Sequence, residues 1–152
     1  MNKVFKVGLI GCGHISETYF RGHDYFNNFQ IVKCADINEE NAKKCSETYG
    51  ITACSVEDLV NDSEIEIILN LTIPRAHFEV AKQSLEKGKH VYSEKPMAVN
   101  FSEGQELLEL SKSKGLYIGN APDTFLGGGI QKSIELINKG KIGNVRLGSA
   151  IF

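Results

Sequence analysis

The run IEIILNL at residues 65–71 limits the folds that this chain can adopt more than any other feature does. It is apolar at almost every position rather than at every second one, which is typical of a strand covered on both faces. Such strands occur mainly in parallel sheets, where crossover helices pack on the two faces. The run therefore predicts a central strand of a parallel sheet with helices on both sides.

Segments typical of strands and helices alternate along the rest of the chain. The other expected strands are residues 4–10, 30–35, 52–55, 90–93, 116–119 and 145–152. The expected helices are residues 15–21, 39–49, 56–60, 74–87, 102–114 and a segment from Ile130 that ends before Gly140. Ser102 and Gln105 form the S-x-x-Q pattern of a helix capping box. This order predicts an α/β fold, a Rossmann-type doubly wound parallel sheet.

Composition excludes several classes of partner. The 152 residues include 17 Lys and Arg and 19 Asp and Glu. The chain therefore has no excess of basic residues of the kind that binds nucleic acid. The apolar stretch from Val7 to Ile10 is shorter than the roughly 7–15 residues of a signal-peptide core, and no segment approaches the ~20 apolar residues of a membrane span. We therefore expect a cytoplasmic protein that binds neither nucleic acid nor a membrane.

Four cysteines, Cys12, Cys34, Cys45 and Cys54, are spread over the first third of the chain. No pair has the C-x-x-C spacing that is typical of zinc and redox sites. We therefore expect free thiols in a reducing compartment and no metal site.

A glycine-rich loop, GLIGCGHIS, joins the first expected strand to the first expected helix. Gly11 suits the tight turn, and Gly13 lets a pyrophosphate approach the backbone at the positive end of the helix. Ser16 takes the place of the third glycine of the dinucleotide-binding fingerprint, where a small residue is needed for helix–strand packing. The loop predicts a dinucleotide site, with an ordinary glycine-rich turn as the alternative.

Asp36 ends the second expected strand, about 20 residues beyond Ser16, where the fingerprint has its acidic residue. A carboxylate there can accept hydrogen bonds from both hydroxyls of the adenosine ribose and would repel a 2′-phosphate. Ile37 and Asn38 follow it, and neither offers a cation for that phosphate. We therefore expect NAD to be favoured over NADP, although Asp36 could instead merely cap the next helix.

Three segments together resemble the Gfo/Idh/MocA family of NAD(P)-dependent oxidoreductases. They are the glycine loop, NLTIPRAH at residues 70–77 and SEKP at residues 93–96, and APDTFLGGGIQ at residues 121–131 also resembles a variant in that family. The resemblance covers the whole chain. It implies an NAD(P)-dependent dehydrogenase or reductase that acts on CH–OH groups of sugars, inositols, related polyols or small carbonyl compounds.

The resemblance also implies where the cofactor binds. The residues carried over lie at strand ends: Gly11, Gly13, His14 and Ile15 at the pyrophosphate with Cys12 contributing its backbone, Asp36 at the adenosine ribose, Thr72, Pro74 and His77 beside the cofactor, Glu94 at the nicotinamide ribose, and Asn120 on the same rim. Other roles stay open. His77 also fits an ordinary first-turn helix residue, Thr72 fits a helix cap, and Glu94 with Lys95 fits an exposed pair worth under ~1 kcal/mol.

Lys95 is the expected catalytic residue, facing the nicotinamide and the substrate hydroxyl. Its ammonium can hydrogen-bond that hydroxyl and stabilise alkoxide character as the hydride leaves. Pro96 fixes its own φ and restricts the preceding residue to extended backbone, so Lys95 is held in one direction. A cis Lys95–Pro96 bond is compatible with the sequence.

In the family a second, sheet-based domain follows and adds further catalytic residues. We therefore expect a nucleotide-binding domain at residues 1–143, and at residues 144–152 the first strand of a truncated C-terminal α+β domain. The whole protein would have roughly 300–350 residues in two domains and form a homo-oligomer. This chain alone would bind NAD but be catalytically incomplete.

A non-catalytic nucleotide-binding or redox-sensing module is the alternative function, because fold does not fix function. Lys95 separates the two hypotheses, since a sensor needs no lysine beside the nicotinamide.

Overall fold

The computed structural model describes residues 3–23, 25–122 and 124–149. By its internal contacts the chain divides into two units, Met1–Ala121 and Pro122–Phe152, and each is described here by itself. The expected domain boundary after residue 143 stays a prediction.

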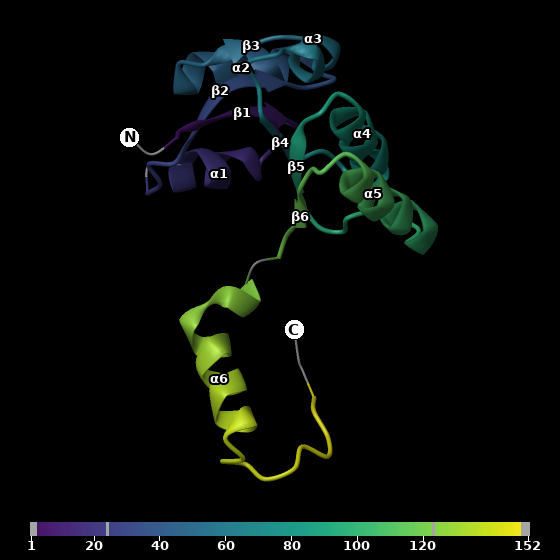
Figure 1. The fold of residues 1–152 in the computed structure, drawn as a ribbon. Coiled ribbons are helices and arrows are strands. Elements are labelled where there is room, and N and C mark those ends of the chain that lie inside the picture. The colour runs from purple at the N-terminus through teal and green to yellow at the C-terminus, as the bar shows by residue number, and fades with distance from the viewer. Residues whose placement is uncertain (1–2, 24, 123, 150–152) are drawn as a thin grey trace. The chain divides into compact units, whose positions relative to one another are not determined.

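The first unit contains a six-stranded sheet in which every pair of neighbouring strands is parallel (Figure 1). Its strands are β1 (Phe5–Ile10), β2 (Phe29–Ala35), β3 (Thr52–Ala53), β4 (Ile67–Asn70), β5 (His90–Ser93) and β6 (Ile118–Asn120). The order β3-β2-β1-β4-β5-β6 is that of a doubly wound nucleotide-binding sheet, in which the chain returns to the middle between β3 and β4. The predicted fold class is confirmed, with the apolar 65–71 run at the centre as β4.

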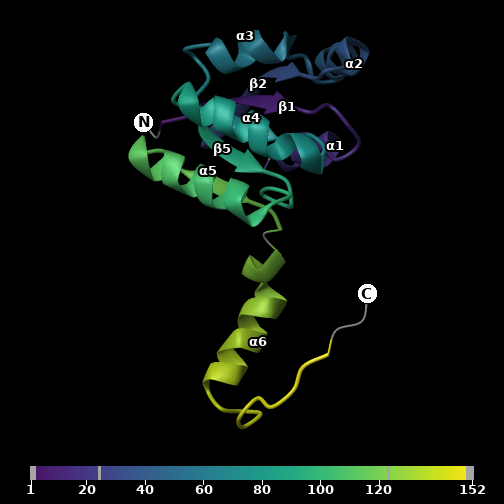
Figure 2. The ribbon, with the colours of Figure 1, turned by 90° about the vertical axis from the view of Figure 1, so that its right-hand side faces the viewer.

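Helices cover both faces of this sheet (Figures 1 and 2). They are α1 (Ser16–His23), α2 (Glu39–Tyr49), α3 (Val56–Asn61), α4 (Pro74–Glu86) and α5 (Phe101–Ser113). Alternate residues of β1 separate the faces, because side chains along a strand point to opposite sides. Leu9 packs in one core cluster with Phe20 of α1, whereas Ile10 packs in another with Leu59 of α3.

The capping box of α5 differs from the prediction. Asn100, in extended backbone, precedes the helix, and the Glu103 side chain accepts hydrogen bonds from its backbone and side-chain N–H groups. Ser102 and Gln105 were the wrong pair, because the helix begins at Phe101 and Ser102 already lies inside it. Two overlapping capping patterns occur here, and the asparagine at the earlier position takes the cap.

The second unit contains a short 3₁₀ turn, η1 (Thr124–Leu126), and one helix, α6 (Gly128–Asn138). Gly140 follows the helix with a φ of 68°, as expected for a helix end. The strand expected over 145–152 does not form at residues 145–149, and its remaining part lies outside the described residues. A strand needs a neighbour for its backbone N–H and C=O groups, and no described segment pairs with these residues.

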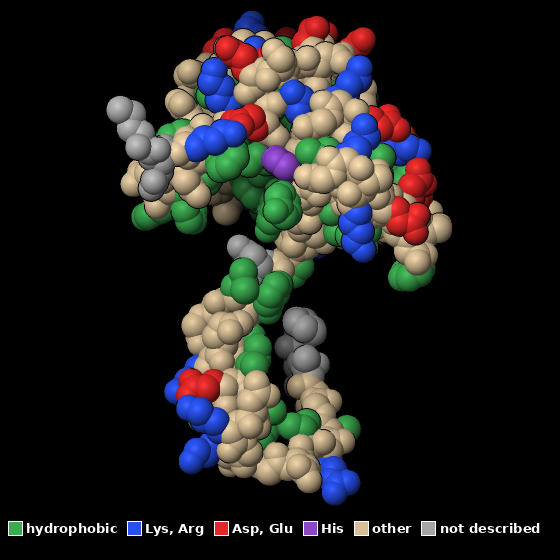
Figure 3. Space-filling view, in the orientation of Figure 1, with side chains coloured by type: hydrophobic (Ala, Val, Ile, Leu, Met, Phe, Trp, Pro, Cys, Tyr) green, Lys and Arg blue, Asp and Glu red, His purple; other side chains and the backbone are tan. Residues whose placement is uncertain are grey.

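None of the helices in the described part of the chain combines the length and the hydrophobicity that a membrane crossing needs. On the face seen in Figure 3, Lys and Arg side chains are interspersed with Asp and Glu.

The ion pair between Lys33 of β2 and Asp62 predicts how stability changes in acid. The Lys33 ammonium donates to the Asp62 carboxylate and lowers the pKa of Asp62 below its ordinary value of 3.8. Because the lowered pKa belongs to the folded state, the pair stabilises the fold above pH 3.8 and loses this effect as the pH falls from there through the folded-state pKa. Asp62→Asn should therefore lower the free energy of unfolding at pH 7 and flatten its decline in acid, as measured by urea denaturation at several pH values. Glu57→Gln, at an exposed position of α3, is the control, and an acid slope unchanged by Asp62→Asn would contradict the assignment.

Candidate functional site

The predicted site residues follow the carboxyl ends of five adjacent strands. Asp36, Glu94 and Asn120 stand at the ends of β2, β5 and β6, and the glycine loop and Thr72 follow β1 and β4. The strand ends are in register, since Ile10 pairs with both Ala35 and Asn70. Parallel strands bring such ends to one edge, and ligands of open α/β sheets bind there. The sequence therefore places these residues along a single rim.

Gly11 makes the sharp turn out of β1. Its φ is 102°, and its backbone N–H donates to the Ala35 carbonyl at 2.9 Å. A Cβ atom on this residue would lie 2.6 Å from the carbonyl carbon and oxygen of Leu71, so β4 approaches too closely for any side chain. Glycine is required here for the packing of the loop, before any ligand is considered.

Gly13 stands in the opposite situation. No atom lies within 4 Å of the position its Cβ would occupy, so the loop faces open space there. The backbone N–H groups of Gly13, His14 and Ile15 donate to no acceptor among the described residues, and they stand at the start of α1. Unpaired N–H groups at a helix N-terminus bind anions. The loop thus fits a pyrophosphate.

Ser16 fills the third position of the fingerprint. It is 5% exposed, and its hydroxyl donates to the Gly13 carbonyl at 2.7 Å. The small side chain lets α1 pack closely on the sheet, and its hydrogen bond also stabilises the loop. This contact explains why serine is accepted where the fingerprint has glycine.

Asp36 is fixed by two backbone N–H groups. One carboxylate oxygen accepts from Cys12 at 2.8 Å and the other from Asn38 at 2.8 Å. The carboxylate therefore joins the end of β2 to the glycine loop while its remaining lone pairs stay available to a ribose.

A groove of about 720 Å³ runs past this carboxylate. It is lined mainly by apolar side chains and by the glycine loop: Ile10, Gly11, Gly13, His14, Ile15, Asp36, Ile37, Asn41, Val56, Leu71, Thr72, Ile73, Ala76 and Val80. Its volume lies in the range of small-molecule sites, and the polar groups gather at the loop and at Asp36. An apolar groove with an anion site at one end fits an adenosine and its pyrophosphate.

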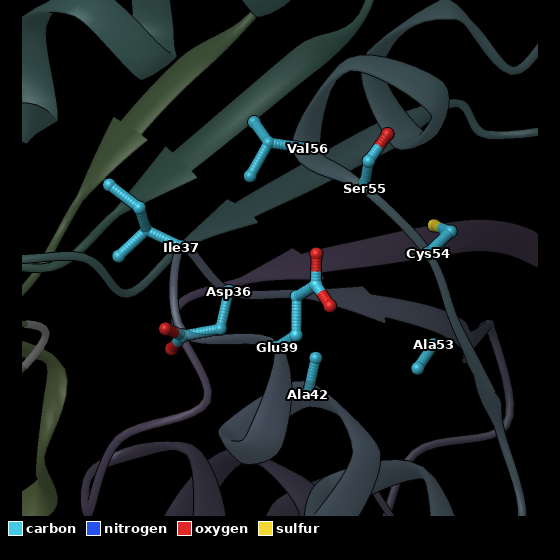
Figure 4. Close-up of a pocket in the computed structure, with 8 residues that line it drawn as sticks. All are labelled: Asp36, Ile37, Glu39, Ala42, Ala53, Cys54, Ser55 and Val56. Atoms are coloured by element: carbon cyan, nitrogen blue, oxygen red, sulfur yellow. The ribbon is translucent and has the colours of Figure 1, made fainter.

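A smaller hollow of about 400 Å³ adjoins Asp36 on the side of β3. Figure 4 shows its lining residues, among which Glu39 brings a second carboxylate that points in a different direction from that of Asp36. No Lys or Arg is among the described residues that line this hollow. The surroundings of the expected ribose position are therefore unfavourable to a 2′-phosphate.

His77 lies behind the rim rather than on it. The residue is 0% exposed, and its ring nitrogens lie 2.5 Å from the Pro96 carbonyl oxygen and 2.9 Å from that of Thr72. Buried Asn70 donates to the His77 carbonyl at 2.9 Å and accepts from the Thr72 hydroxyl at 2.7 Å. His77 therefore links the loop after β4 to the loop after β5, and the expected cofactor contact stays a prediction.

Thr72 and Pro74 bound the loop after β4. Thr72 lines the groove, whereas Pro74 occupies the first turn of α4, where its missing N–H is not needed. The alternative role of Thr72 as a helix cap is not observed, because Ile73 is the residue that precedes the helix and it supplies no side-chain hydrogen bond.

Glu94 and Lys95 follow β5. The Glu94 carboxylate accepts from the Tyr19 hydroxyl at 2.8 Å and from the Lys95 backbone N–H at 3.1 Å. Lys95 is exposed, forms no ion pair among the described residues, and precedes a cis peptide bond to Pro96. The alternative, an exposed Glu94–Lys95 ion pair, is therefore not observed among the described residues, and the ammonium stays available to a substrate.

Two further contacts hold this loop. Asn120 donates from its side-chain nitrogen to the Ser93 carbonyl at 3.0 Å and to the Glu94 carbonyl at 2.9 Å. The Tyr19 hydroxyl of α1 donates to the Glu94 carboxylate and so connects α1 with the loop after β5. Sequence reasoning missed Tyr19, because a tyrosine within an amphipathic helix gives no sign of a partner 75 residues away.

Comparisons with known proteins agree with this geometry. The oxidoreductase family with an NAD-binding Rossmann fold, GFO_IDH_MocA, matches residues 5–121. Inositol 2-dehydrogenase/D-chiro-inositol 3-dehydrogenase of Lactiplantibacillus plantarum is 31% identical over 116 residues, which cover 74% of this chain and 33% of that protein. The chain thus spans about a third of the length of the curated relatives it matches.

Solved structures show the same fold. Biliverdin reductase from Synechocystis sp. PCC 6803, in complex with biliverdin and NADP⁺, superposes with a TM-score of 0.78 at 30% identity, over 88% of this chain and 43% of that one. An NAD-binding protein from Listeria innocua superposes with a TM-score of 0.84 at 20% identity, over 91% and 41% of the two chains. One neighbour is named for NAD and the other holds NADP⁺, so the choice of cofactor depends on the residues of this chain.

Proposed function

The chain belongs to the Gfo/Idh/MocA family of oxidoreductases, and on that premise we propose that it is the NAD-binding part of an enzyme that transfers hydride between nicotinamide and a sugar, inositol or related polyol, or a small carbonyl compound. One observation carries the proposal: Lys95, exposed and without an ion-pair partner among the described residues, stands on the same rim as the glycine loop and Asp36. A protein that only binds the nucleotide needs the glycine loop and the Asp36 carboxylate, but it does not need the Lys95 ammonium on this rim.

In this proposal the bound cofactor supplies the nicotinamide ring that accepts the hydride, and the chain supplies orientation and charge. Asp36 accepts hydrogen bonds from the adenosine ribose, and Glu94, steadied by Tyr19, accepts from the nicotinamide ribose. The Lys95 ammonium would hydrogen-bond the substrate hydroxyl and stabilise negative charge on its oxygen, while the hydroxyl proton passes to solvent and the hydride departs from carbon to the cofactor.

Further parts of the proposal concern the whole protein. Residues 1–143 form the nucleotide-binding domain, and residues 144–152 begin a second domain that supplies the remaining substrate contacts. The whole protein is a cytoplasmic homo-oligomer, and the present chain binds NAD without efficient turnover. The chain's coverage of about a third of its curated relatives supports the proposal of a second domain.

Cofactor choice is tested by equilibrium binding. We expect this chain to bind NAD at least about tenfold more tightly than NADP, a difference of about 1.4 kcal/mol, because the Asp36 carboxylate would repel the 2′-phosphate and no Lys or Arg is among the described residues that line the adjoining hollow. Asp36→Ala should weaken NAD binding and bring the two dissociation constants together, as measured by calorimetry or by fluorescence of the reduced cofactors.

The control for this test is Glu47→Gln, which removes a negative charge from an exposed position of α2 and should leave the preference unchanged. Tighter binding of NADP by the unmodified chain would reverse the cofactor assignment.

A further inference from the structure

Three of the four cysteines meet behind the glycine loop, although they are far apart in the sequence. Cys12 lies in the loop, Cys34 in β2 and Cys45 in α2, and their sulfur atoms all lie within 4.8 Å of one another. Cys34 is 0% exposed and Cys45 7%, while Cys12 is partly exposed. All four thiols are free, as expected, but their spacing in the sequence gives no indication that three of them lie together.

The fourth cysteine is placed differently. Cys54 packs in the core cluster of Ile10 and Leu59, on the other face of the sheet from the three sulfurs. Its thiol donates weakly to the Cys34 carbonyl at 3.8 Å. Cys54 thus offers a thiol in the same domain that does not belong to the cluster.

A surface hollow gives access to the cluster. It has a volume of about 420 Å³, and both Cys12 and Cys45 line it together with His14 and Glu17. A purely structural core thiol has no such approach from solvent. Two of the three cysteines therefore border a hollow that is open to small solutes, whereas Cys34 is fully buried.

The chemistry of three converging sulfurs is that of a soft metal ion. In a tetrahedral site with Zn–S distances of about 2.3 Å the sulfurs stand about 4 Å apart, close to the separation present here. Thiolate sulfur selects Zn²⁺, Cd²⁺ and Cu⁺ over hard cations. We propose that Cys12, Cys34 and Cys45 bind one thiophilic metal ion of the Zn²⁺ and Cd²⁺ class through three thiolates, with a fourth position that faces the hollow and takes a water molecule.

Binding exchanges three S–H bonds for three metal–sulfur bonds, and three protons pass to solvent. At present the thiols donate to backbone carbonyls, Cys12 to Ala35 at 3.6 Å and Cys34 to Ala42 at 3.4 Å. Burial raises the pKa of Cys45 to about 12, so the metal must displace a proton there at neutral pH. The apparent affinity should therefore rise with pH.

The test uses the reduced 152-residue chain and Cd²⁺ as the probe. We expect titration to produce a thiolate-to-cadmium charge-transfer band that saturates at one ion per chain, with the same stoichiometry in native mass spectrometry. Cys45→Ser and Cys12→Ser should each weaken the affinity by more than the roughly 10–100-fold that loss of an outer partner causes. Cys54→Ser, the matched control, should bind as the unmodified chain does.

Circular dichroism establishes that each variant is folded, and alkylation supplies a readout that does not depend on the spectrum. Zn²⁺ should slow alkylation of Cys12 and Cys45 in the unmodified chain and leave Cys54 unaffected. Absence of the band, a band that persists in Cys45→Ser, or equal protection of Cys54 would overturn the proposal.

Discussion

Lys95→Ala in the whole protein should lower kcat by at least about 100-fold, the effect typical of losing one group that stabilises charge in the transition state. The dissociation constant for NAD should change by less than about threefold, because the loop, Asp36 and Glu94 that bind the cofactor are untouched. Only the ammonium on the substrate hydroxyl is lost, and that contact matters most as negative charge develops on oxygen. Steady-state kinetics with a panel of polyols, beside calorimetric titration with NAD, measures both quantities.

Lys112→Ala is the control for this experiment, since Lys112 is an exposed lysine on α5 away from the strand ends. It should leave both kcat and NAD affinity unchanged. Full turnover by Lys95→Ala would defeat the catalytic assignment and favour the non-catalytic module. A loss of NAD affinity equal to the loss in kcat would instead place Lys95 in cofactor binding.

Alanine at Gly11 and at Gly13 should give opposite results, although the two glycines are separated by a single residue. Gly11→Ala should destabilise the fold by about 1–3 kcal/mol, because the new methyl group meets the Leu71 carbonyl and the backbone has a positive φ. Gly13→Ala should change the free energy of unfolding by less than about 0.5 kcal/mol, since nothing lies near its Cβ position. The same substitution should nonetheless weaken NAD binding at least about tenfold, because the methyl group occupies the approach of the pyrophosphate.

Urea denaturation and NAD titration of the two variants separate these effects without any need for turnover. NAD affinity retained in Gly13→Ala would remove the loop from the cofactor site. A stable Gly11→Ala would mean that the contact with β4 can relax.

The sheet could be predicted in detail because its signals are local. The strand in the apolar run at 65–71 and the helix Glu39–Tyr49 each depend on neighbouring residues, and both are confirmed. Once the strands are predicted, the positions of their carboxyl ends are known. The location of Asp36 and Lys95 at one edge of the sheet could therefore be predicted as well.

Features that depend on contacts between distant parts of the chain could not be predicted from the sequence. His77 stands in the first turn of a helix, and only the tertiary structure shows that its ring lies between two loops. The spacing of the cysteines along the sequence did not indicate a cluster, because the three residues come from a loop, a strand and a helix. The segment after residue 144 has the composition of a strand, but composition supplies no neighbour for its backbone.

The rim loops are held mainly through their main chain. Asn70, His77 and Asn120 all make hydrogen bonds to backbone carbonyl groups, which every residue type possesses. The shape of the loops is therefore largely independent of the side chains they display, such as the exposed Ile73 and Val99. In the proposed enzyme, a framework of this kind would tolerate substitution at its surface while Lys95 stays in place, so substrate preference could change without a change in the residues proposed for hydride transfer.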